Sequence, residues 1–155
     1  MALKPDRIEL QSDVSFFMNN ATASTIVRGG VVSLDTSATG VGAAMDDANA
    51  VVAYASNPSG SYAVGVLLND VVNIDLTRQH MNYHTDEVQG GGKVALLRNG
   101  QVVTNNLDGS PTAGATAYLH SGGNLSSTQL SGAPAVGQFL SGKDSDGYAK
   151  VSINI

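Results

Sequence analysis

The histidines His80 and His84 are the residues whose types and spacing come closest to a metal site. An H-x-x-x-H spacing places two imidazoles on one face of a helix, and Asp86 or Glu87 could supply a third ligand to zinc. Zinc proteases, however, carry a glutamate directly after the first histidine, where this chain has Met81. The segment is also polar and follows a predicted strand, which favours a loop between strands. We therefore expect no bound metal and keep a metal-dependent enzyme only as an alternative.

Other catalytic patterns in the sequence are incomplete. Asp144–Gly147 begins like an EF-hand loop, but its glycine comes too early and no glutamate follows. Gly90–Lys93 lacks the spacing of a phosphate-binding loop, and neither a G-x-S-x-G elbow nor an acidic partner for His120 is evident. Glutamate occurs only at Glu9 and Glu87, so a paired-carboxylate hydrolase would depend on aspartates in loops. The sequence thus predicts a protein that is not an enzyme and needs no cofactor.

Charge and composition argue against several classes of partner. Eight basic and thirteen acidic residues give a formal net charge of -5, and the basic residues are scattered along the chain. No basic stripe is evident that could follow a phosphate backbone, so we expect no nucleic-acid partner. No apolar run approaches the roughly 20 residues of a membrane span, so we expect no membrane contact and no signal peptide. Because the chain has no cysteine, it forms no disulfide and offers no thiolate.

The elements that must position any functional residue are predicted to be strands. The chain has 18 glycines and only 14% of its residues are charged, a profile of short strands and tight turns rather than of helices. The clearest local pattern is Lys93–Arg98, Asn99-Gly100 and Gln101–Thr104, which predicts a hairpin with a two-residue turn. Asn57–Gly60 predicts a further turn.

Short apolar segments recur between such turns, which predicts an all-β barrel or sandwich over residues 26–155. The segments are Ile26–Leu34, Tyr62–Leu68, Val71–Thr77, Thr116–His120, Leu125 onward, Val136–Leu140 and Tyr148–Ile155. Residues 43–55 fit either a short helix or a strand. The side chains expected to point inward are Val72, Ile74, Leu76, Val94, Leu96, Val103 and Val151.

Residues 1–25 read differently from the rest because they combine charged residues, Pro5 and two of the three phenylalanines. The alternation of Ile8 and Leu10 predicts an extended segment. Two interpretations stay open for this segment. It is either a first strand inside the domain or an N-terminal arm that lies on another subunit.

Several segments occur in an order and spacing that resemble those of a known family. They are Gly65–Val71, Gly92–Val103, Gly114–Leu119, Val136–Leu140 and Asp146–Val151, with Arg28–Ser33 as a weaker match upstream. Together they resemble the capsid decoration, or cement, proteins of tailed bacteriophages. The resemblance covers roughly residues 62–155 and depends on the order of the segments, because each is a strand or turn that many β proteins carry.

This resemblance implies a small, tulip-like β-barrel domain with an extended N-terminal arm. The expected function is structural: the protein is assembled in the host cytoplasm, binds the outer surface of the virion capsid and stabilises the head by bridging major capsid subunits. The expected partners are the major capsid protein and further copies of the chain, with a homotrimer favoured and a dimer possible. Such proteins have no active site and no cofactor.

Under the arm interpretation, residues 1–25 anchor the protein to the capsid. Phe16, Phe17 and Met18 are then the expected apolar plugs, with Arg7 as a polar neighbour. An alternative function of a different class is a carbohydrate- or cell-surface-binding β module of a fibre-like assembly. That class usually carries exposed aromatic rings, and this chain has no tryptophan and five tyrosines.

Overall fold

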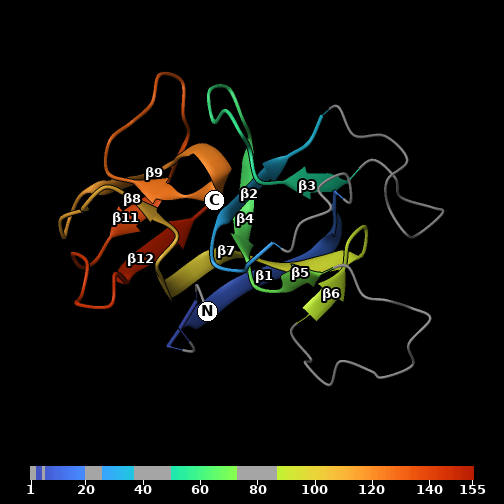
Figure 1. The fold of residues 1–155 in the computed structure, drawn as a ribbon, viewed down its shortest axis with the longest axis horizontal. Helices are drawn as coiled ribbons and strands as arrows, with labels where there is room; N and C mark the ends of the chain where they lie inside the picture. The colour runs from blue at the N-terminus through green and yellow to red at the C-terminus, as the bar shows by residue number, and fades with distance from the viewer. Residues whose placement is uncertain (1–2, 5, 20–25, 37–49, 73–86) are drawn as a thin grey trace.

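The fold is almost entirely β, which confirms the predicted class (Figure 1). The computed structural model describes residues 3–4, 6–19, 26–36, 50–72 and 87–155. Within these ranges the elements are β1 (Ile8–Met18), β2 (Val31–Leu34), β3 (Val51–Ala53), β4 (Ala63–Leu67), β5 (Asp70–Val72), β6 (Glu87–Gln89), β7 (Lys93–Thr104), β8 (Leu107–Asp108), β9 (Thr116–Leu119), the 3-10 turn η1 (Ser121–Gly123), β10 (Leu125–Ser126), β11 (Ala135–Phe139) and β12 (Ala149–Asn154). No helix in the described part of the chain is long and apolar enough to cross a membrane.

Ten of these strands form one mixed sheet around the long strand β7. The order is β1-β3-β2-β4-β7-β12-β11-β9-β10-β8, and β1 also pairs with β7. The pairings therefore close a ring through β1, β3, β2, β4 and β7, from which the remaining strands continue. β5 and β6 pair separately in parallel. The finer choice between a barrel, a sandwich and a tulip stays a prediction.

Two clusters of buried side chains hold the sheet together. The larger cluster contains Val31, Val66 and Leu97 together with residues of β9, β11 and β12. The smaller cluster includes Val32 and Leu96 and lies near β5 and β6. Because β2, β4 and β7 each contribute to both clusters, their two faces are buried. This explains why β4 reads as a continuous apolar run rather than as an alternating one.

The predicted turn at Asn57–Gly60 and several of the predicted strands are confirmed. β9 and β10 form an antiparallel pair across η1, and β11 and β12 form another. In the predicted turn at Asn57–Gly60, the Ser61 amide donates to the Pro58 carbonyl over 3.1 Å. Residues 43–55 include β3, so the strand alternative is correct for Val51–Ala53. These elements share clear local turn chemistry, which is why the sequence identifies them.

The hairpin predicted at Asn99-Gly100 is wrong, because β7 runs from Lys93 to Thr104 without a turn. β12 and β1 pair with this part of β7, and these long ladders outweigh the local turn preference. Gly100 is needed here for a different reason. A Cβ at this position would overlap the carbonyl oxygen of Ile8 on β1.

The same error in β7 affects the predicted core. Val94, Leu96 and Val151 are buried, as expected. Val103 is only half-buried, because the uninterrupted strand turns Val102 into the core instead. Core facing was thus predicted correctly where the alternation was regular and incorrectly just beyond the supposed turn.

Other predictions are only partly covered by the described residues. Val72, expected to point inward, is half-buried at the end of β5. Ile74 and Leu76 lie outside the described residues, as do His80 and His84.

Candidate functional site

Three exposed aliphatic side chains lie on β1, at the start of the chain. Ile8 is 50% exposed, Leu10 73% and Val14 63%. We refer to these three residues as the β1 surface. Residues 8–16 pair only with β7, and no strand of the described chain lies along their other edge. An open edge with apolar side chains is a template for pairing with another chain.

Both ends of this segment are fixed to its own chain. At one end Leu3 is buried and forms a bridge with Thr104 at the end of β7. At the other end Met18 is buried, and its amide donates to the Gly92 carbonyl over 3.0 Å. The middle of β1 is therefore held in place while its side chains stay exposed, and Figure 1 shows this strand (blue) crossing the molecule beside β7.

The structure corrects the prediction that Phe17 and Met18 are apolar plugs for a capsid. Phe17 and Met18 are buried by their own chain, because the end of β1 enters the sheet between β7 and β3. They are not available to a capsid in this conformation. Phe16 is half-buried against the smaller core cluster, and Arg7 forms a 2.5 Å ion pair with Glu9. Residues 8–18 thus form a strand of the main sheet, as the first-strand interpretation predicts.

The residues that remain exposed were missed as contact candidates. In the sequence, Ile8 and Leu10 predict only an extended segment, and no pattern distinguishes Val14. The alternation of Ile8 and Leu10 would have identified a strand, but it does not reveal which face stays uncovered. The aromatic side chains predict a contact at the end of β1, which is buried, rather than at its middle, which is exposed.

The acidic groups on β1 have partners within the chain. The Asp13 carboxylate accepts hydrogen bonds from the Ser15 hydroxyl and amide, over 2.5 and 2.8 Å, and lies 4.0 Å from Arg98. The hydrogen bond from the Ser15 hydroxyl is the main reason why the pKa of Asp13 falls below its usual value. Because these acidic side chains have partners within the chain, the exposed aliphatic side chains are the feature of β1 that most favours contact with another chain.

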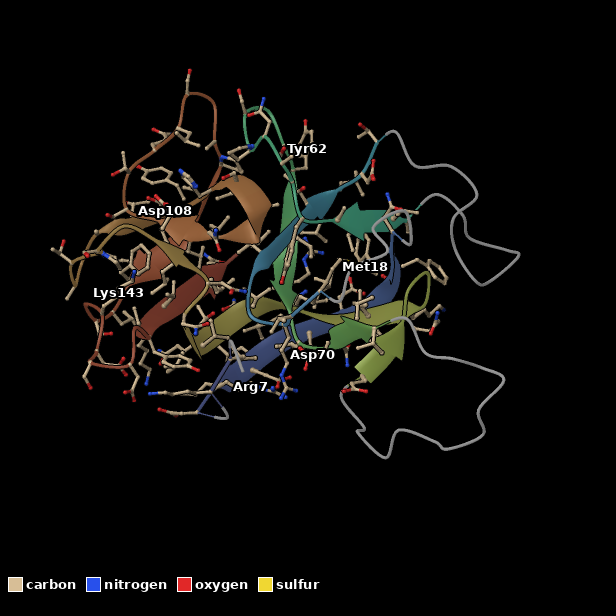
Figure 2. The ribbon with its side chains drawn as sticks, in the orientation of Figure 1. Arg7, Met18, Tyr62, Asp70, Asp108 and Lys143 are labelled. Carbon is tan, nitrogen blue, oxygen red and sulfur yellow. The ribbon has the colours of Figure 1, made fainter. Side chains whose placement is uncertain are left out.

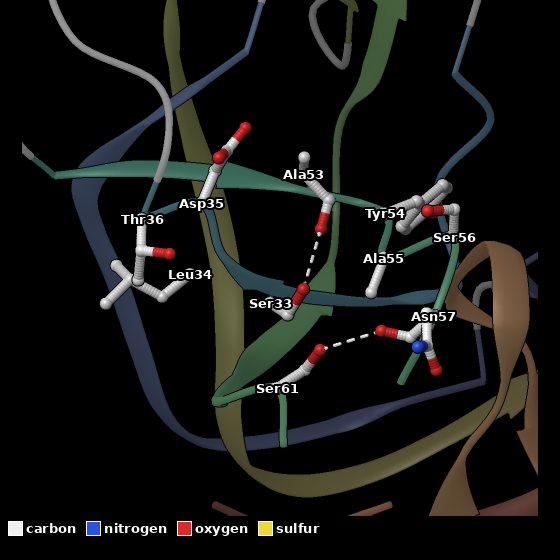
Figure 3. A pocket seen from close by; sticks show the side chains of 10 residues that line it. All are labelled: Ser33, Leu34, Asp35, Thr36, Ala53, Tyr54, Ala55, Ser56, Asn57 and Ser61. Atoms are coloured by element: carbon white, nitrogen blue, oxygen red, sulfur yellow. Dashed lines mark hydrogen bonds between the residues drawn. The ribbon is translucent and has the colours of Figure 1, made fainter. Parts of the chain in front are cut away.

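A second candidate is a polar cleft of about 300 Å³ at the ends of β2 and β3 (Figure 3). Its polar side chains belong to Ser33, Asp35, Thr36, Ser56, Asn57 and Ser61. The Asn19 side-chain nitrogen Nδ2 donates to the Asp35 carboxylate over 2.6 Å, and the Asn57 side-chain oxygen accepts from the Ser59 backbone amide over 3.1 Å. The Ser61 hydroxyl donates to the Asn57 carbonyl over 3.0 Å. These bonds fix the lining while the cleft opens to solvent.

Tyr54 connects this region to the rest of the fold and was not recognised from the sequence. Its hydroxyl donates to the Val27 carbonyl over 2.8 Å and accepts from the Gly30 amide over 3.1 Å. A Cβ on Gly30 would lie 2.8 Å from the ring carbon Cζ, and one on Gly123 would lie 2.7 Å from Cε1. The absence of side chains at these two glycines leaves room for the Tyr54 ring. Burial of the ring raises the pKa of the Tyr54 hydroxyl above its usual value.

His120 does have an acidic neighbour, contrary to the sequence analysis. Its Nε2 lies 3.6 Å from Asp108, and its Nδ1 lies 3.3 Å from the Ser121 hydroxyl. The first distance is too long for a hydrogen bond. In a hydrolase triad the serine contacts Nε2 and the acid contacts Nδ1. In this protein Ser121 lies near Nδ1 and Asp108 near Nε2, so the two ring nitrogens have exchanged partners. This geometry does not activate Ser121 as a nucleophile.

The loop that resembles the start of an EF-hand is held by a lysine. Lys4 Nζ lies 3.0 Å from Asp144, 4.0 Å from Asp146 and 4.3 Å from the centre of the Tyr148 ring. The hydrogen bond to Asp144 raises the pKa of Lys4, and the Tyr148 amide is the main cause of the lowered pKa of Asp144. The described residues contain no group of three or more metal-ligating His, Cys, Asp or Glu side chains.

Comparison with known proteins adds no family to this picture. No protein-family model matches the sequence, and no curated protein matches it. The function proposed below therefore depends on the resemblance described above and on the surfaces of the molecule.

Proposed function

We propose that this chain is a structural virion protein that decorates the outer surface of a tailed-phage capsid. It stabilises the head by bridging major capsid subunits, without catalysis and without a cofactor. The capsid protein and further copies of this chain are its partners, with a homotrimer as the favoured assembly and a dimer as the alternative. The observation that carries the proposal beyond the resemblance is the β1 surface.

The β1 surface has the properties of a contact that a partner completes. A strand added along the open edge would satisfy its backbone amides and carbonyls, while the side chains of Ile8, Leu10 and Val14 pack against the partner. Fully burying one such side chain contributes about 1.5–3 kcal/mol. Because much of each is exposed, the three together can supply several kcal/mol per subunit. An oligomer presents several copies at once, which strengthens binding further.

The low charge of the chain also supports association. Charged residues make up 14% of the sequence, against about 25% in typical soluble domains. A surface with few charges is poorly protected against contact with other chains. Part of this surface is therefore expected to be covered in an assembly.

Binding to capsids that lack this protein tests the proposal. The intact chain should co-sediment with such capsids and raise the temperature at which they release DNA. The double variant Leu10→Ser, Val14→Ser removes most of the β1 surface without touching a buried residue. The matched control is Leu130→Ser, Leu140→Ser, which replaces two partly exposed leucines that lie outside the strands. We expect the first variant to lose at least tenfold in occupancy and the control to bind normally.

Circular dichroism of each variant distinguishes lost binding from lost folding. If the intact chain leaves the capsids unchanged, the proposed function is wrong. If the intact chain binds and the β1 variant binds equally well while folded, decoration stands and the β1 surface is not the contact.

A further inference from the structure

The two longest stretches of the sequence without a charged side chain meet at one end of the molecule. Residues 48–69 and 109–142 contain no aspartate, glutamate, lysine or arginine. In the fold, the Gly60 amide donates to the Gly132 carbonyl over 3.0 Å, which joins the turn before β4 to the loop before β11. Figure 1 shows these two loops projecting at the top of the view, whereas β1 lies in its lower half.

An exposed tyrosine lies at this uncharged end, which we define as residues 57–62 and 128–133. Tyr62 is 74% exposed. The Leu34 amide donates to its carbonyl over 2.9 Å, so Leu34, which is also exposed, is its cross-strand neighbour. Figure 2 shows Tyr62 near the top of the view, far above Arg7, which precedes β1. This apolar pair and the β1 surface are therefore two separate exposed groups on different sides of the molecule.

We propose that copies of this chain associate with one another through the uncharged end. The proposed function requires association between copies, and the inference rests on it to that extent, because it names the surface that serves. A contact at this end leaves the β1 surface free for the capsid.

Net charge favours a second copy as the occupant. Each chain carries a formal net charge of -5, so two copies repel each other in most orientations. Contact through the uncharged end places no like charges opposite one another and buries no charged group of the two loops. A partner of opposite charge finds no charge in these loops to bind. Asp35, which lines the neighbouring cleft with Ser61, accepts a 2.6 Å hydrogen bond from Asn19 within its own chain.

Hydrogen bonds hold both loops in place before a partner arrives. Within the first loop, the Ser61 amide donates to the Pro58 carbonyl over 3.1 Å. Within the second, the Ala133 amide donates to the Leu130 carbonyl over 2.9 Å. Pro58 and Ala133 are themselves buried. Preformed loops lose little conformational freedom on binding, and tyrosine is among the side chains that most often dominate an interface.

The size of the uncharged end predicts a weak contact. A stable interface usually involves about 20–30 residues on each side, and the two loops supply fewer. We therefore expect a dissociation constant of about 0.1–1 mM for the free chain. On a capsid, neighbouring copies are held at effective concentrations of about 1 mM or more, at which so weak a contact still forms.

Sedimentation velocity of the full chain, without capsids, measures this association. Between about 20 μM and about 2 mM, the average mass should rise from that of a monomer towards that of an oligomer. Tyr62→Ser should weaken association at least about tenfold and leave the circular dichroism spectrum unchanged, because this side chain is exposed. Raising the NaCl concentration from about 20 mM to about 300 mM should strengthen association, because salt screens the repulsion between acidic copies.

A pair of charge variants makes the test specific. Ser131→Asp and Ser145→Asp each add one negative charge at an exposed serine, the first at the uncharged end and the second in the loop before β12. Ser131→Asp should weaken association at least about tenfold, whereas Ser145→Asp should weaken it less than about threefold. The inference is overturned if the two variants weaken association equally, if Tyr62→Ser associates as well as the intact chain, or if salt weakens association. It is also overturned if the intact chain stays monomeric at about 2 mM.

Capsid binding is measured separately, so the two proposals can fail separately. A chain that associates through Tyr62 but leaves capsids unchanged retains this surface and refutes decoration. A chain that binds capsids through the β1 surface but stays monomeric in solution overturns this inference alone. The variant Leu10→Ser, Val14→Ser should associate normally, because the β1 surface lies elsewhere on the molecule.

Discussion

Replacement of Tyr54 by phenylalanine removes one oxygen from the place where three parts of the fold meet. The ring stays between Gly30 and Gly123, so packing is preserved. Two hydrogen bonds are lost, the one accepted from the Gly30 amide and the one donated to the Val27 carbonyl. Gly30 is buried, so its amide loses its partner and costs about 1–3 kcal/mol. Val27 is exposed and its carbonyl can be hydrated, so it adds little.

The expected loss is therefore about 1.5–3 kcal/mol in the free energy of unfolding, measured by urea denaturation followed by circular dichroism. Tyr62→Phe is the matched control, because its side chain is exposed and makes no hydrogen bond in the described structure. We expect the control to change stability by less than about 0.5 kcal/mol. If Tyr54→Phe is equally neutral, the two hydrogen bonds of the hydroxyl do not hold these segments together.

Three other predictions test separate features. Gly100→Ala should cost about 1–3 kcal/mol and raise amide exchange in residues 8–11, because its Cβ overlaps the Ile8 carbonyl, whereas Gly142→Ala should be nearly neutral. Stability should fall above pH 10, because the folded-state pKa of Tyr54 lies above its ordinary 10.0 and the folded state retains a proton that the unfolded state releases. A urea midpoint that falls equally in Tyr54→Phe over that range would contradict this. Lys4→Met should raise the pKa of Asp144, measured by carboxyl NMR, because the hydrogen bond from Lys4 is lost. The pKa should stay below 3.8, because the Tyr148 amide still donates to Asp144. An unchanged pKa would refute the role of the lysine.

The class of the fold followed from the sequence where local chemistry and tertiary pairing agree. The β9–β10 and β11–β12 pairs are joined through glycine-rich or Asp-containing loops, and their strands were placed to within a residue or two. Asn99-Gly100 shows the opposite case. Its dipeptide has the strongest local turn preference in the chain, yet β1 and β12 pair on either side of it. Pairing partners far away in sequence are not visible in a local pattern.

The candidate surfaces were less predictable for a related reason. The residue types of Phe17 and Met18 predict apolar contacts. Whether these side chains are buried depends on β7 and β3, which lie far along the chain. The cleft brings Asp35 together with Asn57 and Ser61 through the pairing of β2 with β3 and β4, and no motif encodes that meeting. No sequence pattern distinguishes Tyr54. Its role depends on Gly30 and Gly123, which lie far from it in the sequence and enclose its ring in the fold.

The position of β7 in the chain has a consequence for biosynthesis. β1 ends at Met18 and its partner β7 begins at Lys93, so about 75 residues are translated between the two. At bacterial or eukaryotic rates of 5–20 residues per second, β1 waits roughly 4–15 s before its partner leaves the ribosome. During that time both backbone edges of β1 are open to any extended polypeptide nearby, including other nascent copies of the same chain, whereas β7 covers one of them in the folded protein. The strand that we assign to assembly is thus also the segment that a cell making many copies must keep apart until β7 arrives.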